Sequence, residues 1–98
     1  MTLCSEFVVY RIKNDDTETF KSIHARVQSD LKKIPGYISL KTQIHITDPC
    51  LRIDCVTWEN QGKAKAAYEI FKTLPSSKAL MDLVDEVCFS GHFYDSLL

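Results

Sequence analysis

Hydrophobic residues recur along this chain with two different spacings. Between residues 20 and 34 they return every three or four positions, the spacing of one helix face. These positions are Phe20, Ile23, Val27, Leu31 and Ile34. The polar run Asn14-Asp15-Asp16-Thr17 offers capping groups and negative charge for a helix start, and Pro35-Gly36 stops the helix. His24 flanks the apolar face, and we expect it to be a solvated edge residue.

Elsewhere the spacing is two, the period of a β-strand. Residues 7–13 are rich in β-branched and aromatic side chains and predict a first strand. Residues 37–46 and 51–58 alternate on either side of the turn Thr47-Asp48-Pro49, which predicts a hairpin. Residues 87–94 predict a last strand, with Phe89 and Phe93 on the side that helices cover.

The alternation within the hairpin predicts which residues face each other. Pairing Ile44 with Leu51 and Thr42 with Ile53 keeps the apolar positions on one side of the sheet. The same register places Lys41 opposite Asp54 on the other side, where opposite charges stabilise the pair. We therefore expect these polar residues to point away from the helices.

The segment between the hairpin and the last strand predicts a second, interrupted helix. Residues 61–73 carry an apolar face that includes Ala64, Ala67 and Phe71. Pro75 breaks the pattern, and Ser76-Ser77 would cap a new helical piece over residues 78–86.

The element order is strand, helix, strand, strand, helix, strand. This order predicts an α+β protein with the ferredoxin-like β-α-β-β-α-β arrangement, a four-stranded antiparallel sheet and both helices on one face. Residues 1–98 fit a single domain in length and composition.

Alternate residues of the predicted strands form a second sheet face that the helices leave uncovered. These residues are Phe7, Val9, Arg11, Ser39, Lys41, Gln43, His45, Arg52, Asp54, Val56, Trp58, Ser90, His92 and Tyr94. A solvated sheet face rarely presents so many aromatic and aliphatic side chains, so we expect it to be covered. Because the set is too polar for a plain core, it predicts a homodimer whose two sheets enclose a partly wet cavity.

Seven residues of this face are candidates for a ligand pocket, although none is assigned as catalytic. They are Arg11, Lys41, Arg52, Asp54, Trp58, His92 and Tyr94. His92 and Tyr94 could act as base and hydrogen-bond donor toward a phenol or enol, and the arginines could hold an anionic oxygen. The alternatives are interface packing for His92, an ion pair with Asp54 for Arg52, and core closure for Trp58.

Composition narrows the classes of partner. The formal net charge is −1 and the basic residues are scattered, which argues against nucleic acid as a partner. No apolar run is long enough to span a membrane, and residues 1–6 lack the features of a secretion signal, so we expect a cytoplasmic protein. The cysteines, at positions 4, 50, 55 and 88, are spread without a C-x-x-C spacing, which favours reduced thiols and no metal site.

The whole chain resembles the dimeric α+β barrel superfamily, especially the antibiotic-biosynthesis-monooxygenase-like proteins. The resemblance lies in the opening strand 6–10, the Pro35-Gly36-Tyr37 turn, the segment 56–59 running into a helix, and the broken second helix. It implies a homodimer with a pocket between sheet and helices. Members include cofactor-free oxygenases of aromatic polyketides, small-molecule isomerases and haem-degrading enzymes. The haem-degrading members place an Asn on the first strand and a His on the second helix, and this chain has neither.

Two functions therefore stay open. The first is a cofactor-independent enzyme of the monooxygenase-like kind that oxidises a small aromatic or enolic molecule. The second is a non-catalytic dimeric domain that binds a small ligand or acts in regulation. The lack of any His between residues 61 and 86 weakens the first without excluding it.

Overall fold

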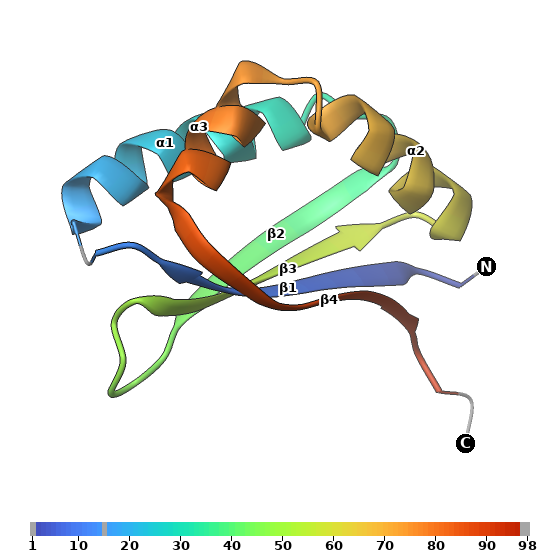
Figure 1. Cartoon of the computed structure of the whole chain (residues 1–98). Coiled ribbons are helices and arrows are strands. Elements are labelled where there is room, and N and C mark those ends of the chain that lie inside the picture. The colour runs from blue at the N-terminus through green and yellow to red at the C-terminus, as the bar shows by residue number, and fades with distance from the viewer. Residues whose placement is uncertain (1, 15, 97–98) are drawn as a thin grey trace.

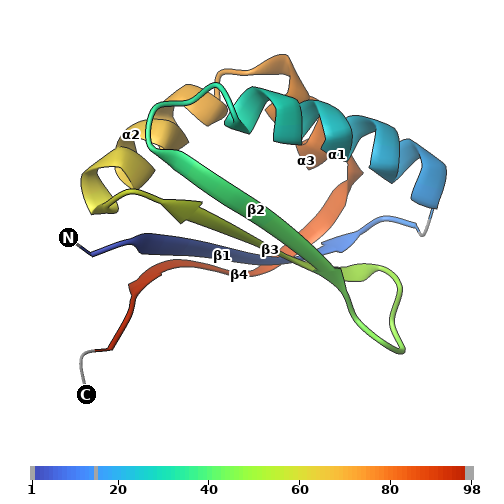
Figure 2. The ribbon, with the colours of Figure 1, turned by 180° about the vertical axis from the view of Figure 1, so that it is seen from behind.

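A computed structural model describes residues 2–14 and 16–96, which form four strands and three helices. The strands are β1 (Cys4–Ile12), β2 (Tyr37–Ile44), β3 (Leu51–Trp58) and β4 (Val84–Tyr94). The helices are α1 (Thr17–Leu31), α2 (Gln61–Phe71) and α3 (Pro75–Leu83). The strands pair antiparallel in the order β2-β3-β1-β4. All three helices lie over the same face of this sheet (Figures 1 and 2), which confirms the predicted ferredoxin-like arrangement.

The first helix begins at the predicted polar cluster. The Asp16 carboxylate accepts hydrogen bonds from the backbone N–H of Thr19 at 3.1 Å and from its hydroxyl at 2.7 Å. These two hydrogen bonds lower the pKa of Asp16, and the bond from the Thr19 hydroxyl has the larger effect. Asp15, also part of the predicted cluster, lies outside the described residues.

The second helix is broken near Pro75, as predicted. Pro75 is the first residue of α3, where its missing N–H costs nothing, so the new helix starts three residues earlier than expected and ends at Leu83. Ser76 therefore lies inside the helix and does not cap it. Its hydroxyl donates a 2.6 Å hydrogen bond to Asp30, which ties α3 to α1.

The hairpin register differs from the prediction by one residue. Thr42 pairs with Asp54 and Ile44 with Arg52, in place of the expected partners Ile53 and Leu51. Because side chains alternate across a strand, this shift turns every residue of β3 to the other face. Arg52, Asp54, Val56 and Trp58 are buried beneath the helices, whereas the residues between them face away.

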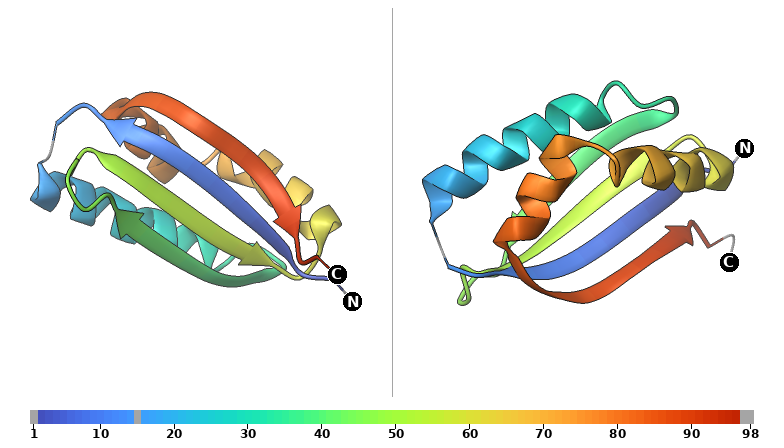
Figure 3. Two further views of the ribbon diagram at one scale, coloured as in Figure 1. Left: turned by 90° about the horizontal axis from the view of Figure 1, so that it is seen from below. Right: turned by 45° about the horizontal axis from the view of Figure 1, so that its top comes forward.

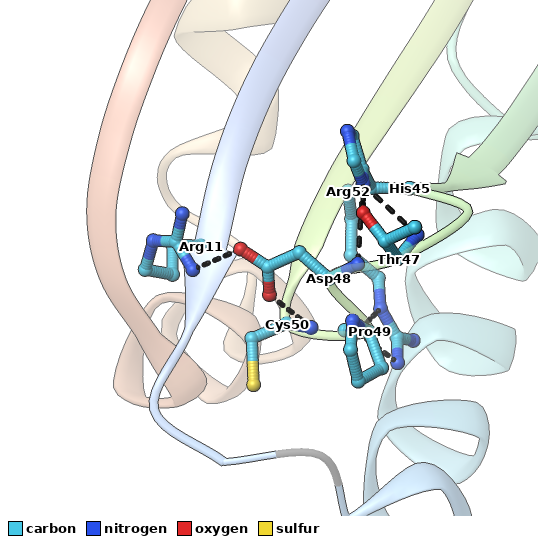
Figure 4. Close-up of polar contacts among 7 residues, drawn as sticks. All are labelled: Arg11, His45, Thr47, Asp48, Pro49, Cys50 and Arg52. Carbon is cyan, nitrogen blue, oxygen red and sulfur yellow. Dashed lines mark hydrogen bonds and ion pairs between the residues drawn. The ribbon is translucent and has the colours of Figure 1, made fainter.

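The turn of the hairpin explains the shift (Figure 4). Asp48 accepts a 2.6 Å ion-paired hydrogen bond from Arg11 on β1 and a bond from the N–H of Cys50. Its own carbonyl accepts from the N–H of Leu51 at 3.0 Å, and the Leu51 carbonyl accepts from the N–H of His45. The hairpin therefore closes through Leu51, and the first pair of facing strand residues is Ile44 with Arg52.

A β-bulge changes the faces of β4 as well. Tyr10 pairs with Val87 and Val9 pairs with Phe89, so Cys88 is an extra residue in β4. Beyond it, Phe89 and Phe93 turn away from the helices, where each is 47% exposed. The prediction that these two phenylalanines lie under the helices was wrong.

The uncovered sheet face is consequently more apolar than predicted. Its apolar members are Phe7, Val9, Leu51, Ile53, Cys55, Phe89 and Phe93. Phe93 makes an edge contact with Phe7, with ring centroids 5.6 Å apart, and a tilted contact with Phe89 at 5.9 Å. The view from below in Figure 3 shows this face with no helix over it.

Two further features of the described part of the chain bear on the expectations from sequence. Its four cysteines are free thiols, of which Cys4 is buried and Cys88 is exposed. None of its helices combines the length and apolarity needed to cross a membrane.

Candidate functional site

The predicted pocket residues do not share one face of the sheet. Arg11 and Lys41 lie on the uncovered face, as predicted. In the sheet they pair with Leu51 and Cys55, which also face away from the helices. The other five candidates lie on the helix side, and the prediction of their face was wrong. Arg52, Asp54 and Trp58 are turned by the hairpin register, and His92 and Tyr94 are turned by the bulge at Cys88. The structure thus brings together only part of the predicted set.

A cavity of about 110 Å³ lies between the sheet and the helices. Most of its walls are apolar and come from every layer of the fold: Val8, Leu31, Leu40, Val56, Phe71 and Leu80. Five residues with polar atoms also line it, namely Glu6 and Tyr10 of β1, Asp54 and Trp58 of β3, and Tyr68 of α2. A concave, mostly apolar space with a few placed polar groups is the usual form of a small-molecule site.

Asp54 is the centre of a polar cluster at one end of this cavity. The Tyr10 hydroxyl donates to Asp54 Oδ2 at 3.1 Å, and the Thr42 hydroxyl donates to Oδ1 at 2.7 Å. His24 Nε2 lies 3.3 Å from both carboxylate oxygens and 3.1 Å from the Thr42 hydroxyl. Both oxygens of this buried carboxylate therefore have hydrogen-bonding partners among its neighbours.

His24 was not predicted as part of any site. Its imidazole stacks on Phe20, with ring centroids 5.0 Å apart, and its side chain is largely buried against β2 and β3. The signal was its position, because it follows Phe20 by four residues and precedes Val27 by three, which places it on the buried stripe of α1.

Tyr10 keeps its proton in this environment. Burial first, and then the charge of Asp54 and the hydrogen bond to it, raise the pKa of Tyr10 above its ordinary value. The phenol is therefore a neutral donor committed to Asp54, and its oxygen remains as an acceptor on the cavity wall.

Glu6 forms a second polar group at the other end of the cavity. Its Oε1 accepts a 3.1 Å hydrogen bond from the indole Nε1–H of Trp58, and its Oε2 lies 3.9 Å from His92 Nε2. The Glu6 side chain is mostly buried, whereas His92 is about one-third exposed and lines a separate, more open hollow with Tyr94. A carboxylate at the cavity wall thus has a partly exposed imidazole beside it.

Arg52 does not form the ion pair with Asp54 that the sequence suggested. It is 3% exposed, and its Nε and Nη2 donate to the carbonyl of Pro49 at 3.1 and 3.0 Å (Figure 4). Its guanidinium also lies 4.3 Å from the centre of the Phe20 ring, a cation–π contact. Arg52 therefore stabilises the hairpin turn and the helix above it, outside the cavity.

We compared the sequence and the structure with those of known proteins. No model of a known protein family matches the sequence, and a search of curated proteins finds no relative. Among solved structures, SnoaB, a cofactor-independent oxygenase from Streptomyces nogalater, matches with a TM-score of 0.79 and 15% identity over 100% of this chain and 95% of that chain. A candidate antibiotic biosynthesis monooxygenase from Nitrosomonas europaea matches with a TM-score of 0.75 and 19% identity, over 98% and 90% of the two chains.

A similar candidate from Bordetella bronchiseptica has a TM-score of 0.76 and 14% identity, over 99% and 100% of the two chains. At these identities the likeness establishes the fold. The chain has the α+β fold of the antibiotic-biosynthesis-monooxygenase-like proteins along nearly its whole length, as the sequence resemblance implied.

Proposed function

We propose that this protein is a cofactor-independent oxygenase that acts on a small aromatic or enolic molecule bound in the cavity between sheet and helices. The observation that carries the proposal is the Glu6 carboxylate, which lies at the wall of an apolar cavity with His92 behind it. A base on an apolar wall is placed to deprotonate an enol or phenol whose ring displaces water from that wall. The shared fold with SnoaB supports the same chemistry.

The reaction can be written with the residues of this chain and molecular oxygen as the oxidant. Glu6 takes a proton from an acidic O–H or C–H group, which leaves a delocalised substrate anion. This anion passes one electron to O₂, and the two radicals combine to a peroxide on a carbon that keeps one hydrogen. The proton returns from Glu6 to the peroxide, and loss of water leaves a carbonyl group. One substrate and one O₂ thus give one carbonyl product and one water.

The cavity volume sets the size of the substrate. Ligand sites for drug-sized molecules usually measure about 300–1,000 Å³, well above the 110 Å³ found here. A cavity of about 150 Å³ holds benzene in an engineered protein. The cavity here is smaller than that one, so a single six-membered ring is the upper limit of size for a ligand held inside it.

Oxygen consumption tests this proposal. The purified protein, treated with a chelator, is mixed with benzene-1,4-diol or its methyl derivative, and oxygen uptake is followed with an electrode. With ¹⁸O₂, mass spectrometry should find one labelled atom in the product. Glu6→Gln should lower kcat by about 10²–10⁴-fold, the usual contribution of a general base.

Glu59→Gln is the matched control, because Glu59 is an exposed glutamate directly after β3. It should leave the rate unchanged. Oxidation at the wild-type rate by Glu6→Gln would refute the role of Glu6. Binding of these molecules without oxygen uptake would instead support the non-catalytic ligand-binding domain.

We also propose that the protein is a homodimer, formed through the uncovered face of the sheet. This proposal is supported by the apolar character of that face, where Phe89 and Phe93 are each 47% exposed. A monomer would expose this patch to water, at a cost of roughly 25 cal/mol for each Å² of apolar surface. A second copy of the same face would cover it symmetrically.

The oligomeric state of single variants tests the dimer. Phe93→Asp should give a monomer by light scattering coupled to size-exclusion chromatography, because the new carboxylate would be buried at the interface. Ile70→Asp is the control, since Ile70 is similarly exposed at 42% but lies on α2 away from this face. A wild-type protein that runs as a monomer at micromolar concentration would contradict the proposal.

A further inference from the structure

We infer that the cavity recognises the hydroxyl form of its ligand and rejects the corresponding carbonyl form. The inference concerns the same cavity as the proposed function and gives its ligand a chemical class. That class is a one-ring molecule with a hydrogen-bond donor at each of two opposite ends and an apolar middle. The argument comes from the direction of the hydrogen bonds that the polar wall residues already make.

At one end of the cavity the available group is the Tyr10 oxygen. A phenol has one proton to donate, and Tyr10 gives it to Asp54. Asp54 Oδ2 accepts this proton at 3.1 Å, and Thr42 and His24 hold the carboxylate in position on its other side, so the Tyr10 proton stays directed at Asp54. The Tyr10 oxygen still carries lone pairs. A ligand at this end can therefore donate a hydrogen bond to the Tyr10 oxygen. Tyr10 has no second proton with which to donate a hydrogen bond to the ligand.

At the other end the available group is the Glu6 carboxylate. The only N–H of the Trp58 indole is committed to Glu6 Oε1. Glu6 has about four lone-pair sites and receives this one hydrogen bond, with His92 at the longer distance of 3.9 Å from Oε2. Acceptor capacity therefore remains on Glu6, whereas the donor of Trp58 is used.

The spacing of these two acceptors suits a single ring. Glu6 and Tyr10 are four residues apart on β1, which corresponds to roughly 13 Å between their Cα atoms. Val8 lies between them on the same face and makes the floor apolar. The side chains of Glu6 and Tyr10 occupy part of this distance. A six-membered ring with opposite hydroxyl groups, and a hydrogen bond of about 2.8 Å at each end, is of a length that can fill the rest.

Tyr68 is the other hydroxyl-bearing residue on the cavity wall. It lies on α2, is half exposed, and its ring packs beneath Lys72. Its phenol is not buried as Tyr10 is, so water can satisfy its hydroxyl. Tyr68→Phe consequently serves as a control that removes a hydroxyl from the wall without touching the two buried acceptors.

Because both polar ends of the cavity accept hydrogen bonds, the site distinguishes a diol from the dione formed by its oxidation. A diol satisfies both Glu6 and Tyr10, whereas a dione of the same skeleton places carbonyl lone pairs against them. A site built to receive a hydroxyl rejects an analogue that cannot donate, because buried groups are then left unpaired. We expect at least tenfold weaker binding of the dione. In the proposed reaction, this same repulsion would favour release of the carbonyl product.

Calorimetric titration with two redox-inert probes tests the inference without turnover. The probes are trans-cyclohexane-1,4-diol and cyclohexane-1,4-dione, which share one carbon skeleton and do not consume oxygen. The wild-type protein should bind the diol at least tenfold more tightly. Equal affinity, preference for the dione, or no binding of either probe at millimolar concentration would overturn the inference.

A variant identifies the acceptor. In Glu6→Gln the amide oxygen would take the Trp58 N–H, so the NH₂ group would face the cavity as a donor. The preference for the diol should then fall at least threefold, while Tyr68→Phe should keep it. An unchanged preference in a folded Glu6→Gln protein would exclude Glu6 as the acceptor. A protein that keeps the preference for the diol but consumes no oxygen would refute the proposed oxidation and leave this inference standing.

Discussion

Replacement of Asp54 by alanine tests the hairpin register and the polar cluster together. In the structure Asp54 accepts hydrogen bonds from Tyr10 and Thr42 and lies against His24. Tyr10 is 2% exposed, so removal of the carboxylate leaves its hydroxyl buried without its protein partner. An unsatisfied buried hydroxyl costs about 1–3 kcal/mol. Thr42 and His24 are only partly buried and can recover hydrogen bonds to water, which adds up to about 1 kcal/mol.

The expected loss is therefore about 1–4 kcal/mol, a large share of the roughly 5–15 kcal/mol that stabilises a domain of this size. At roughly 4–8 °C per kcal/mol for such a domain, Tm should fall by about 4–30 °C. Urea unfolding followed by circular dichroism measures the free energy, and calorimetry measures Tm. Asp82→Ala is the control, because Asp82 is exposed on α3 and pairs loosely with Lys78 at 3.8 Å.

The register predicted from sequence gives a different result for the same variant. With Asp54 on the uncovered face opposite Lys41, its removal would be a surface change within about 0.5 kcal/mol. A loss that small would refute the buried cluster. In a second check, Tyr10→Phe combined with Asp54→Ala should lose less than the sum of the single losses, because neither partner is then left unpaired.

Three further outcomes follow from local features. Gly36→Ala should destabilise the fold by roughly 1–2 kcal/mol in urea unfolding, since φ is +91° and an added Cβ would lie 2.6 Å from a lysine side chain of α2. The hydrogen bond from Arg11 lowers the pKa of Asp48, so its stabilisation is complete above about pH 4 and is lost as pH falls further. The stability difference between wild type and Asp48→Asn should shrink accordingly. Iodoacetamide should modify exposed Cys88 before buried Cys4, whose pKa is raised by burial, as read by mass spectrometry.

The elements of the fold could be predicted because their signals are local. The apolar stripe of α1, the cap at Asp16 and the break at Pro75 each depend on a few neighbouring residues. The four strands follow from β-branched and aromatic content in the first and from alternation in the hairpin, with ends that differ by a few residues. The placement of the helices on one face followed from the element order, and the structure confirms it.

The faces of β3 and β4 could not be predicted because they depend on single-residue shifts. In β3 both faces carry apolar side chains, so the pattern does not choose between them, and the usual exposure of Arg and Asp favoured the wrong one. The choice is made by Asp48, which bonds Arg11 across the sheet and sets the turn. In β4 the bulge at Cys88 has no local signature in sequence. The first shift turned Asp54 and Trp58 toward the cavity, and the second turned His92 and Tyr94 to the helix side.

The most direct test of the central claim, a ligand site under the helices, uses the single tryptophan of the chain. Trp58 is 1% exposed, lines the cavity and donates its indole N–H to Glu6. In a ¹H–¹⁵N spectrum this N–H gives one resonance that needs no assignment. Addition of trans-cyclohexane-1,4-diol should shift it saturably, and the equivalent dione should shift it far less. A Trp58 resonance that stays in place while amides of the uncovered face, such as that of Phe93, respond would contradict the account.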